Sequence, residues 1–69
     1  MDYRDKLRDL RTERAISQKE IAEVIQTTQQ YYGKYELHKQ HLPVDRLIML
    51  CKYYGVSADW LLGLDEDQE

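Results

Sequence analysis

Apolar residues recur every three or four positions along most of this chain, and no apolar/polar alternation is long enough to predict a strand. Over residues 3–14, Leu7 and Leu10 follow this spacing among charged residues, which predicts an amphipathic helix. The next helix is predicted to begin after Ser17, because Ser17 and Glu20 have the spacing of a capping box, in which each side chain bonds the other's backbone amide. Four residues are expected on its buried side: Ile21, Ala22, Val24 and Ile25.

A break at residues 26–27 separates this helix from a third helix predicted over about 29–37, with Thr28 as the expected N-cap. The amides Gln29 and Gln30 lie on the polar side of this helix. Its apolar side is expected to contain Tyr32, Tyr35 and, as a further candidate, Tyr31.

Pro43, whose fixed φ suits the first turn of a helix, precedes a fourth predicted helix that ends at Gly55. Ser57 is the expected N-cap of a fifth. The apolar positions of these two helices are Val44, Leu47, Ile48, Cys51 and Tyr54, then Trp60, Leu61, Leu62 and Leu64. The pattern therefore predicts an all-α fold, a compact five-helix domain over residues 1–64, followed by an acidic disordered tail over 65–69.

A chain of 69 residues forms at most one small domain. With 42% apolar and 33% charged residues, its composition is that of a soluble globular protein. No apolar run approaches the roughly 18 residues that a membrane span needs, and residues 1–5 lack the pattern of a signal peptide. The single cysteine, Cys51, cannot close an intrachain disulfide, so we expect a reducing, cytoplasmic location.

The net charge of −3 argues against nucleic acid as a partner when the chain is taken as a whole. Four of the 13 acidic residues, however, fall within the last five positions: Asp65, Glu66, Asp67 and Glu69. The rest of the chain has nine acidic and ten basic residues, a net charge of +1. The total charge therefore does not decide the class of partner.

Two short helices joined by a tight turn, the second carrying amides at its start, are typical of a helix-turn-helix. An α-helix fits the major groove of DNA, and a glutamine amide can bond adenine at two atoms, N6 and N7. Thr28, Gln29 and Gln30 stand at the start of the second helix of this pair, where side chains reach base edges. Glutamines on a helix surface are also common as a merely solvated face, and that alternative stays open at this stage.

Three motifs resemble the DNA-binding domain of the lambdoid phage repressor and Cro family, also called the XRE-type helix-turn-helix. They are Ile16-Ser17-Gln18-x-x-Ile21-Ala22, then Thr27-Thr28-Gln29-Gln30, and Gly55-Val56-Ser57-x-Asp59-Trp60-Leu61-Leu62-Gly63. The resemblance covers about residues 5–64. It implies a fold of five helices, of which the second and third form the DNA-binding motif.

The resemblance also implies roles for individual residues. DNA base contacts would come from Thr28, Gln29, Gln30 and Lys34, and phosphate contacts from Gln18, Lys39, Gln40 and His41. Gln18 would in addition buttress the recognition helix. Arg11 and Glu36 would form a structural ion pair between the first helix and the end of the third.

Three positions depart from the family pattern. Gln26 and His38 stand where the family often has glycine, so a positive φ is expected at Gln26 and the path of the chain after the third helix is open at His38. Gly33 lies inside the recognition helix, which costs about 1 kcal/mol relative to alanine. The loop is also weakly basic, since Val44 and Asp45 follow Pro43, which predicts modest affinity at physiological salt.

Other chemistries are less well supported by the residues. Histidines 38 and 41 with Cys51 are too few ligands for a convincing metal site, and Cys51 is expected in the core. The aromatic residues could stack on single-stranded bases, but their helical spacing favours core packing or a dimer contact. The sequence shows neither a nucleophile paired with a base nor a phosphate-binding glycine loop, so nothing in it predicts an enzyme. No cofactor, metal or small-molecule substrate is expected.

The sequence thus predicts a sequence-specific double-stranded DNA-binding regulator, most simply a repressor that occupies a palindromic operator as a homodimer. The alternative is a helical protein-interaction module, such as an antitoxin or anti-repressor, with little affinity for DNA. The acidic tail and the weakly basic loop are the features that favour this alternative.

Overall fold

The computed structural model describes residues 2–64. They form five helices and no strand: α1 (Tyr3–Glu13), α2 (Gln18–Val24), α3 (Gln29–Glu36), α4 (Val44–Tyr54) and α5 (Ala58–Leu62). The predicted all-α, five-helix fold is therefore confirmed. None of the described helices is long and apolar enough to cross a membrane. The tail predicted over 65–69 lies outside the described residues.

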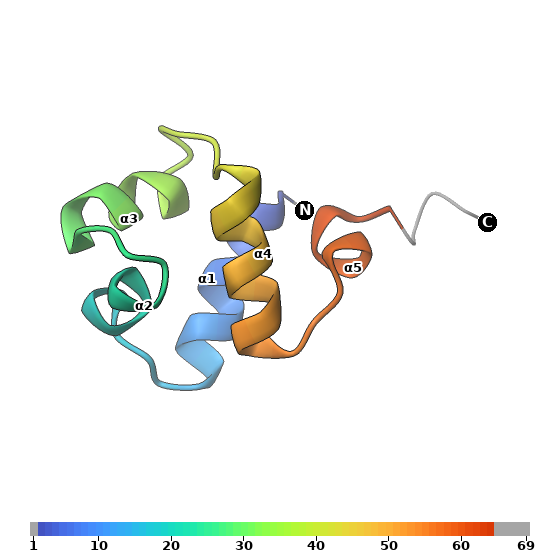
Figure 1. Cartoon of the computed structure of the whole chain (residues 1–69), viewed down its shortest axis with the longest axis horizontal. Helices are drawn as coiled ribbons and strands as arrows, with labels where there is room; N and C mark the ends of the chain where they lie inside the picture. The colour runs from blue at the N-terminus through green and yellow to red at the C-terminus, as the bar shows by residue number, and fades with distance from the viewer. Residues whose placement is uncertain (1, 65–69) are drawn as a thin grey trace.

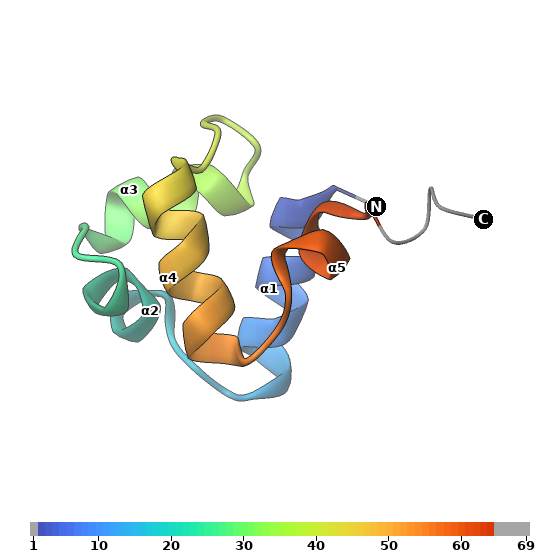
Figure 2. The same cartoon turned by 45° about the vertical axis from the view of Figure 1, so that its right-hand side comes forward.

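The two helices of the predicted motif lie together at one end of the molecule. In both views α2 and α3 are adjacent, α5 lies at the other end, and α1 and α4 run between them (Figures 1 and 2). Helix α1 packs against α3 and α5, α2 against α3 and α4, and α4 against α5. The arrangement leaves the outer side of α3 uncovered by the other helices of the domain.

Side-chain caps start four of the five helices. The residue before each helix accepts a hydrogen bond from an amide in the first turn, at Asp2, Ser17, Thr28 and Ser57. The Glu20 carboxylate was predicted to accept from the Ser17 amide. It accepts instead from the Ser17 hydroxyl, at 3.3 Å. Pro43 precedes the fourth helix as predicted, and it is the N-cap, with extended backbone and no side-chain cap.

Three helices end at a left-handed residue that is not glycine. The φ angles are 56° at Ala15, 61° at Gln26 and 62° at His38. At each site the next amide bonds back to a carbonyl five residues earlier, as from Lys39 to Lys34 at 2.8 Å, which is the Schellman closure. The expected positive φ at Gln26 is confirmed, and His38 turns the chain out of α3 in the same way. The positive φ at Ala15 was not anticipated.

The core brings together apolar side chains from all five helices. Its members are Leu7, Ile21, Ala22, Ile25, Tyr32, Tyr35, Leu42, Leu47, Leu50, Cys51, Tyr54 and Leu61. Cys51 is buried as predicted. Burial raises the pKa of the Cys51 thiol, so this residue behaves as an apolar filler.

Several predicted core positions are exposed instead. Val44 and Ile48 on α4 are 70% and 46% exposed, and Leu50, which the spacing did not place among the core residues, is fully buried. On α5 only Leu61 is buried, while Trp60 and Leu62 are exposed, as is Leu64 after the end of the helix. A domain this small cannot enclose every side of its helices, so apolar spacing alone overestimates the core.

Candidate nucleic-acid interface

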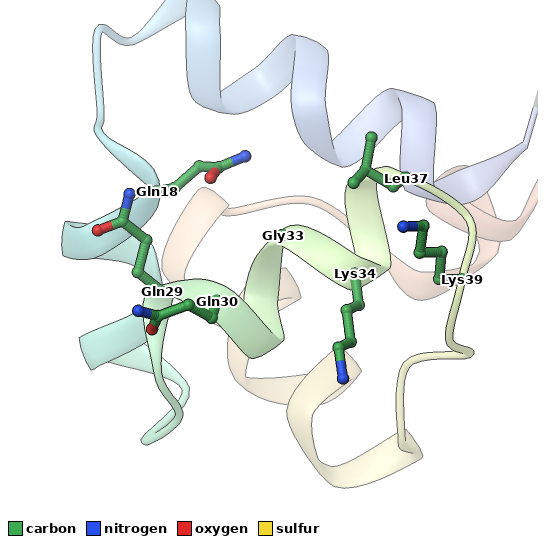
Figure 3. Close-up of a pocket in the computed structure, with 7 residues that line it drawn as sticks. All are labelled: Gln18, Gln29, Gln30, Gly33, Lys34, Leu37 and Lys39. Carbon is green, nitrogen blue, oxygen red and sulfur yellow. The ribbon is translucent and has the colours of Figure 1, made fainter.

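A hollow of about 490 Å³ lies on the exposed side of the α2–α3 pair. It is lined by Gln18, Gln29, Gln30, Gly33, Lys34, Leu37 and Lys39 (Figure 3). Five of these seven residues were predicted as DNA contacts, and they come from α2, α3 and the loop after α3. Among the seven lining residues there are two lysines and no carboxylate, so the local charge is positive although the chain is acidic overall.

The start of α3 presents the two glutamines to solvent. Gln29 and Gln30 are its first two residues, and both are exposed. Thr28 precedes them as the N-cap, where its Oγ1 accepts from the Tyr31 amide at 3.1 Å. Thr28 therefore fixes the start of the helix. Both glutamines line the hollow, and Thr28 does not.

Lys34 projects from the second turn of α3 beside an aromatic ring. Its Nζ lies 5.2 Å from the centre of the Tyr31 ring, a cation–π distance. Tyr31 is 40% exposed and meets Tyr35 edge to face at 5.6 Å. Tyr31 was a candidate for the apolar side of α3, but it lies at the border of the core and supports Lys34 on the surface.

A buried polar network ties the end of α3 to α1 and α2. Arg11 reaches Glu36 with two nitrogens, Nε to Oε2 at 2.7 Å and Nη2 to Oε1 at 3.0 Å. Its remaining Nη1 donates to the carbonyl of Ile16 at 2.9 Å. The Arg11 and Glu36 side chains are only 14% and 6% exposed, so this planar pair orients the helices rather than meeting solvent.

Glu36 stays ionised in this setting. Burial alone would raise its pKa, but hydrogen bonds from Arg11 and Gln18, with the Tyr32 hydroxyl nearby, outweigh burial and leave the pKa below its ordinary value. Burial and the neighbouring carboxylate raise the pKa of Tyr32, which therefore remains neutral. The Tyr32 hydroxyl has no hydrogen bond of good geometry.

Gln18 connects this network to the exposed face. Its Nε2 donates to Glu36 Oε1 at 3.1 Å, which accounts for the buttressing role that the sequence implied. Its Oε1 lies 3.7 Å from the position that a Cβ would take at Gly33. Gly33 lines the hollow without a side chain, as the sequence indicated when it placed a missing side chain in the groove-facing row at this position.

The loop between α3 and α4 carries the other predicted phosphate contacts. Lys39, Gln40 and His41 are all exposed, and Lys39 also lines the hollow. Gln40 and His41 lie outside it. Leu37, which the sequence did not single out, lines the hollow while 67% exposed. Its place at the end of an expected helix carried no signal of a surface role.

Residues from the first turn of α1 contact this same loop. His38 Nε2 lies 2.9 Å from Asp5 Oδ1, and Arg4 Nη1 donates to the Gln40 carbonyl at 2.9 Å. These contacts join residues more than 30 positions apart, so no local pattern could have indicated them.

The residues that suggested other chemistries do not line the hollow. Within residues 2–64 no three side chains of the metal-binding types form a cluster. Tyr32, Tyr35 and Tyr54 are buried in the core, as their spacing predicted. Tyr53 and Trp60 are partly exposed, but they belong to α4 and α5 rather than to the hollow.

Comparison with known proteins agrees with this geometry. The family described as helix-turn-helix matches residues 7–61. The uncharacterized HTH-type transcriptional regulator YobD of Bacillus subtilis (strain 168) is 36% identical over 67 residues, covering 97% of this chain and 60% of YobD. The SPbeta prophage-derived regulator YonR of the same strain is 37% identical, covering 87% of this chain and 56% of YonR. The HTH-type transcriptional regulator ImmR, also from this strain, is 33% identical, covering 96% of this chain and 52% of ImmR.

The chain thus spans between half and two thirds of the length of these relatives. No solved structure gives a significant match. The family match covers most of the chain, including every helix that builds the candidate interface. This chain belongs to the XRE-type helix-turn-helix family.

Proposed function

We propose that this chain is a sequence-specific DNA-binding transcriptional regulator that inserts α3 into the major groove and represses by occupying an operator. The observation that carries this proposal is the hollow on α2–α3, where exposed glutamine amides at the start of α3 are flanked by two lysines. Amides that can bond base edges, next to cations that can bond phosphates, are the two contact types that such a protein needs.

The proposal assigns base contacts to Thr28, Gln29, Gln30 and Lys34, and phosphate contacts to Gln18, Lys39, Gln40 and His41. Side chains in the first turn of a recognition helix reach base edges, and the elements on either side lie along the backbone. The Thr28 hydroxyl accepts a bond from the helix and can still donate its own hydrogen to DNA. The relatives named as HTH-type transcriptional regulators support DNA binding as the function in which these residues would act.

We also propose that the chain binds a palindromic operator as a homodimer in the cytoplasm. One recognition helix reads about four base pairs, too few to specify a genomic site, so two half-sites about one turn apart are needed. Helix α5 lies at the end of the molecule away from α2 and α3 (Figure 2). It exposes Trp60 and Leu62, and Leu64 just after the helix is exposed as well. A contact there would leave the two α3 helices on the outside of the pair.

Sedimentation equilibrium tests this dimer contact. Leu62→Asp should shift the protein toward monomer, because it buries a charge in the proposed contact. Val44→Asp is the matched control, since Val44 is also an exposed apolar residue, at 70%, but lies on α4. Equal effects of the two substitutions would contradict a contact through α5.

Selection of bound duplexes from a random pool tests the DNA-binding proposal. The expected result is a short palindromic consensus, with half-site centres about 34 Å apart. Fluorescence anisotropy against random duplex at about 50 mM salt gives the nonspecific affinity, where phosphate contacts are strongest. No binding at micromolar protein, and no consensus, would favour the protein-interaction alternative.

A further inference from the structure

We infer that the first turn of α1 positions the α3–α4 loop for phosphate binding, so that Tyr3, Arg4 and Asp5 are positioning residues for DNA recognition. The inference rests on the proposed function and adds to it a part of the molecule outside the two helices of the motif. Its basis is a set of three contacts between consecutive residues of α1 and alternate residues of the loop.

The three contacts run antiparallel. The Leu42 amide donates to the Tyr3 hydroxyl at 3.0 Å, Arg4 Nη1 donates to the Gln40 carbonyl at 2.9 Å, and Asp5 pairs with His38 at 2.9 Å. Residues 3, 4 and 5 therefore hold residues 42, 40 and 38. Leu42 is buried, so its amide needs this partner.

Arg4 makes this attachment rigid. It is only 7% exposed, and Asp2 holds its guanidinium with two bonds of 3.0 Å, from Nε and from Nη2. The third nitrogen, Nη1, is thereby aimed at the Gln40 carbonyl. The Arg4 hydrogen bond also holds the pKa of Asp2 well below its ordinary value, so the carboxylate keeps its charge. Because Asp2 fixes the Arg4 guanidinium, the bond to the Gln40 carbonyl restricts the movement of the loop.

The anchored positions alternate with Lys39 and His41, two of the proposed phosphate contacts, and a third, Gln40, is itself anchored through its backbone carbonyl. His38, Gln40 and Leu42 are tied to α1, whereas Lys39 and His41 lie between them with exposed side chains. Fixing the backbone on both sides of Lys39 and His41 orders these residues before DNA arrives. The entropy of ordering the loop is then lost on folding rather than on binding, which favours the complex.

The test compares substitutions that loosen the loop without touching a proposed DNA contact. Tyr3→Phe removes one hydroxyl and no charge, and its control is Tyr53→Phe, at a half-exposed tyrosine on α4. Asp5→Asn removes the carboxylate that contacts His38, and its control is Asp9→Asn, one turn later on α1 with its side chain 49% exposed. Both aspartate variants lose one negative charge, which by itself would strengthen binding to DNA.

We expect Tyr3→Phe and Asp5→Asn to weaken binding to specific and random duplexes alike. The slope of log K against log salt should flatten by about 0.9 for each phosphate that the loop no longer neutralises. The deficit relative to wild type should therefore shrink about threefold between 50 and 200 mM salt. Binding is measured at a temperature where circular dichroism shows every variant folded, so that unfolding does not lower the apparent affinity. Lower stability alone would also leave the salt slope unchanged, whereas a loosened loop flattens it.

Two results would overturn the inference separately from the proposed function. If wild type binds duplex DNA but Tyr3→Phe and Asp5→Asn match their controls, the loop does not depend on α1. Hydrogen exchange on the protein alone gives an answer that needs no DNA. The amides of residues 39–42 should exchange faster in Tyr3→Phe than in wild type while that of Ile21 is unchanged, and equal loop exchange would refute the attachment. Loss of duplex binding in wild type itself would count against the proposed function.

Discussion

The side-chain amide of Gln18 donates to the carboxylate of Glu36 at 3.1 Å, joining the first turn of α2 to the last residue of α3. The same carboxylate oxygen accepts from Arg11 of α1, so three helices meet at one buried group. The orientation of the recognition helix is therefore set by a polar contact as well as by the apolar core.

Removing one member of this group should be costly. Arg11→Met leaves the Glu36 carboxylate buried without its cation, and we expect a loss of about 3 kcal/mol in the free energy of unfolding. Urea denaturation measures it. Arg8→Met, at an arginine whose side chain is 48% exposed, should change the same quantity by less than about 0.5 kcal/mol. The double variant Arg11→Met with Glu36→Met should lose clearly less than the two single losses added together, and strict additivity would contradict a direct pair.

Stability should fall in acid, and Glu36 should account for part of the fall. Because the pKa of Glu36 is lower in the folded protein than in the unfolded chain, the unfolded state binds more protons and stability rises with pH. This contribution is complete above the ordinary glutamate pKa of about 4.3 and is lost as pH drops through the lower folded value. Melting temperature measured from pH 6 to pH 3 should therefore drop less steeply in Glu36→Gln than in wild type. Parallel curves would show that Glu36 is not the group that titrates.

Gln29 and Lys39 should differ in how their loss affects DNA binding. Gln29→Ala should cost about 1–3 kcal/mol on the selected operator and relax the preference at one base pair. Lys39→Ala should weaken all duplexes alike and lower the salt slope by about one. Titrations of both variants on operator and random duplexes separate the two effects. An equal loss on both duplexes for Gln29→Ala would rule out its role as a base reader.

Glycine at a left-handed helix end should stabilise the fold. Ala15 has a φ of 56°, which an alanine adopts at a cost of about 1 kcal/mol, and its side chain is exposed. Ala15→Gly should therefore raise the free energy of unfolding by roughly 0.5–1 kcal/mol, as measured by thermal or urea denaturation. Lys52→Gly, on the exposed side of α4, should lower it by about 1 kcal/mol. A decrease for Ala15→Gly would mean that the alanine methyl makes a contact worth more than the backbone strain.

Replacing Gly33 with alanine should also stabilise the fold, although this is the reverse of the substitution at Ala15. Gly33 has no positive φ, and a Cβ there would meet Gln18 Oε1 at 3.7 Å, an ordinary contact. Gly33→Ala should therefore raise the melting temperature, with a gain of up to about 1 kcal/mol from helix propensity. Gly33→Leu would project much further into the hollow and should weaken duplex binding without unfolding the protein. Normal DNA binding by Gly33→Leu would place the hollow outside the interface.

Local patterns were sufficient for the elements of this fold. Helix starts at Ser17, Thr28 and Ser57 follow from hydroxyls placed just before apolar helical runs, and Gly55 marks the end of α4. These signals act within one or two turns of the chain, so no tertiary contact is needed to read them. The family motifs extended this reading to a candidate interface, because each motif residue has a fixed place on its helix.

Local patterns did not predict which side chains are buried, because burial depends on which other elements pack against a helix. Val44 and Ile48 have the spacing of core residues but face solvent, because none of the other four helices within residues 2–64 covers that side of α4. Arg4 is charged, and an amphipathic helix usually exposes such a side chain to solvent, yet Arg4 is buried between Asp2 and the carbonyl of Gln40. A carbonyl 36 positions away leaves no trace in the pattern around Arg4.

The order of residues alone thus specified the five helices, the N-caps at Ser17, Thr28 and Ser57, and the amides at the start of α3, since each depends on neighbours within a turn or two. Only the tertiary structure decided that Gln18 lies against Glu36, that Gly33 opens a hollow beside two lysines, and that α1 holds the loop. Those relationships join distant residues, and their geometry comes from the packing of helices against one another rather than from the order of residues along any one of them.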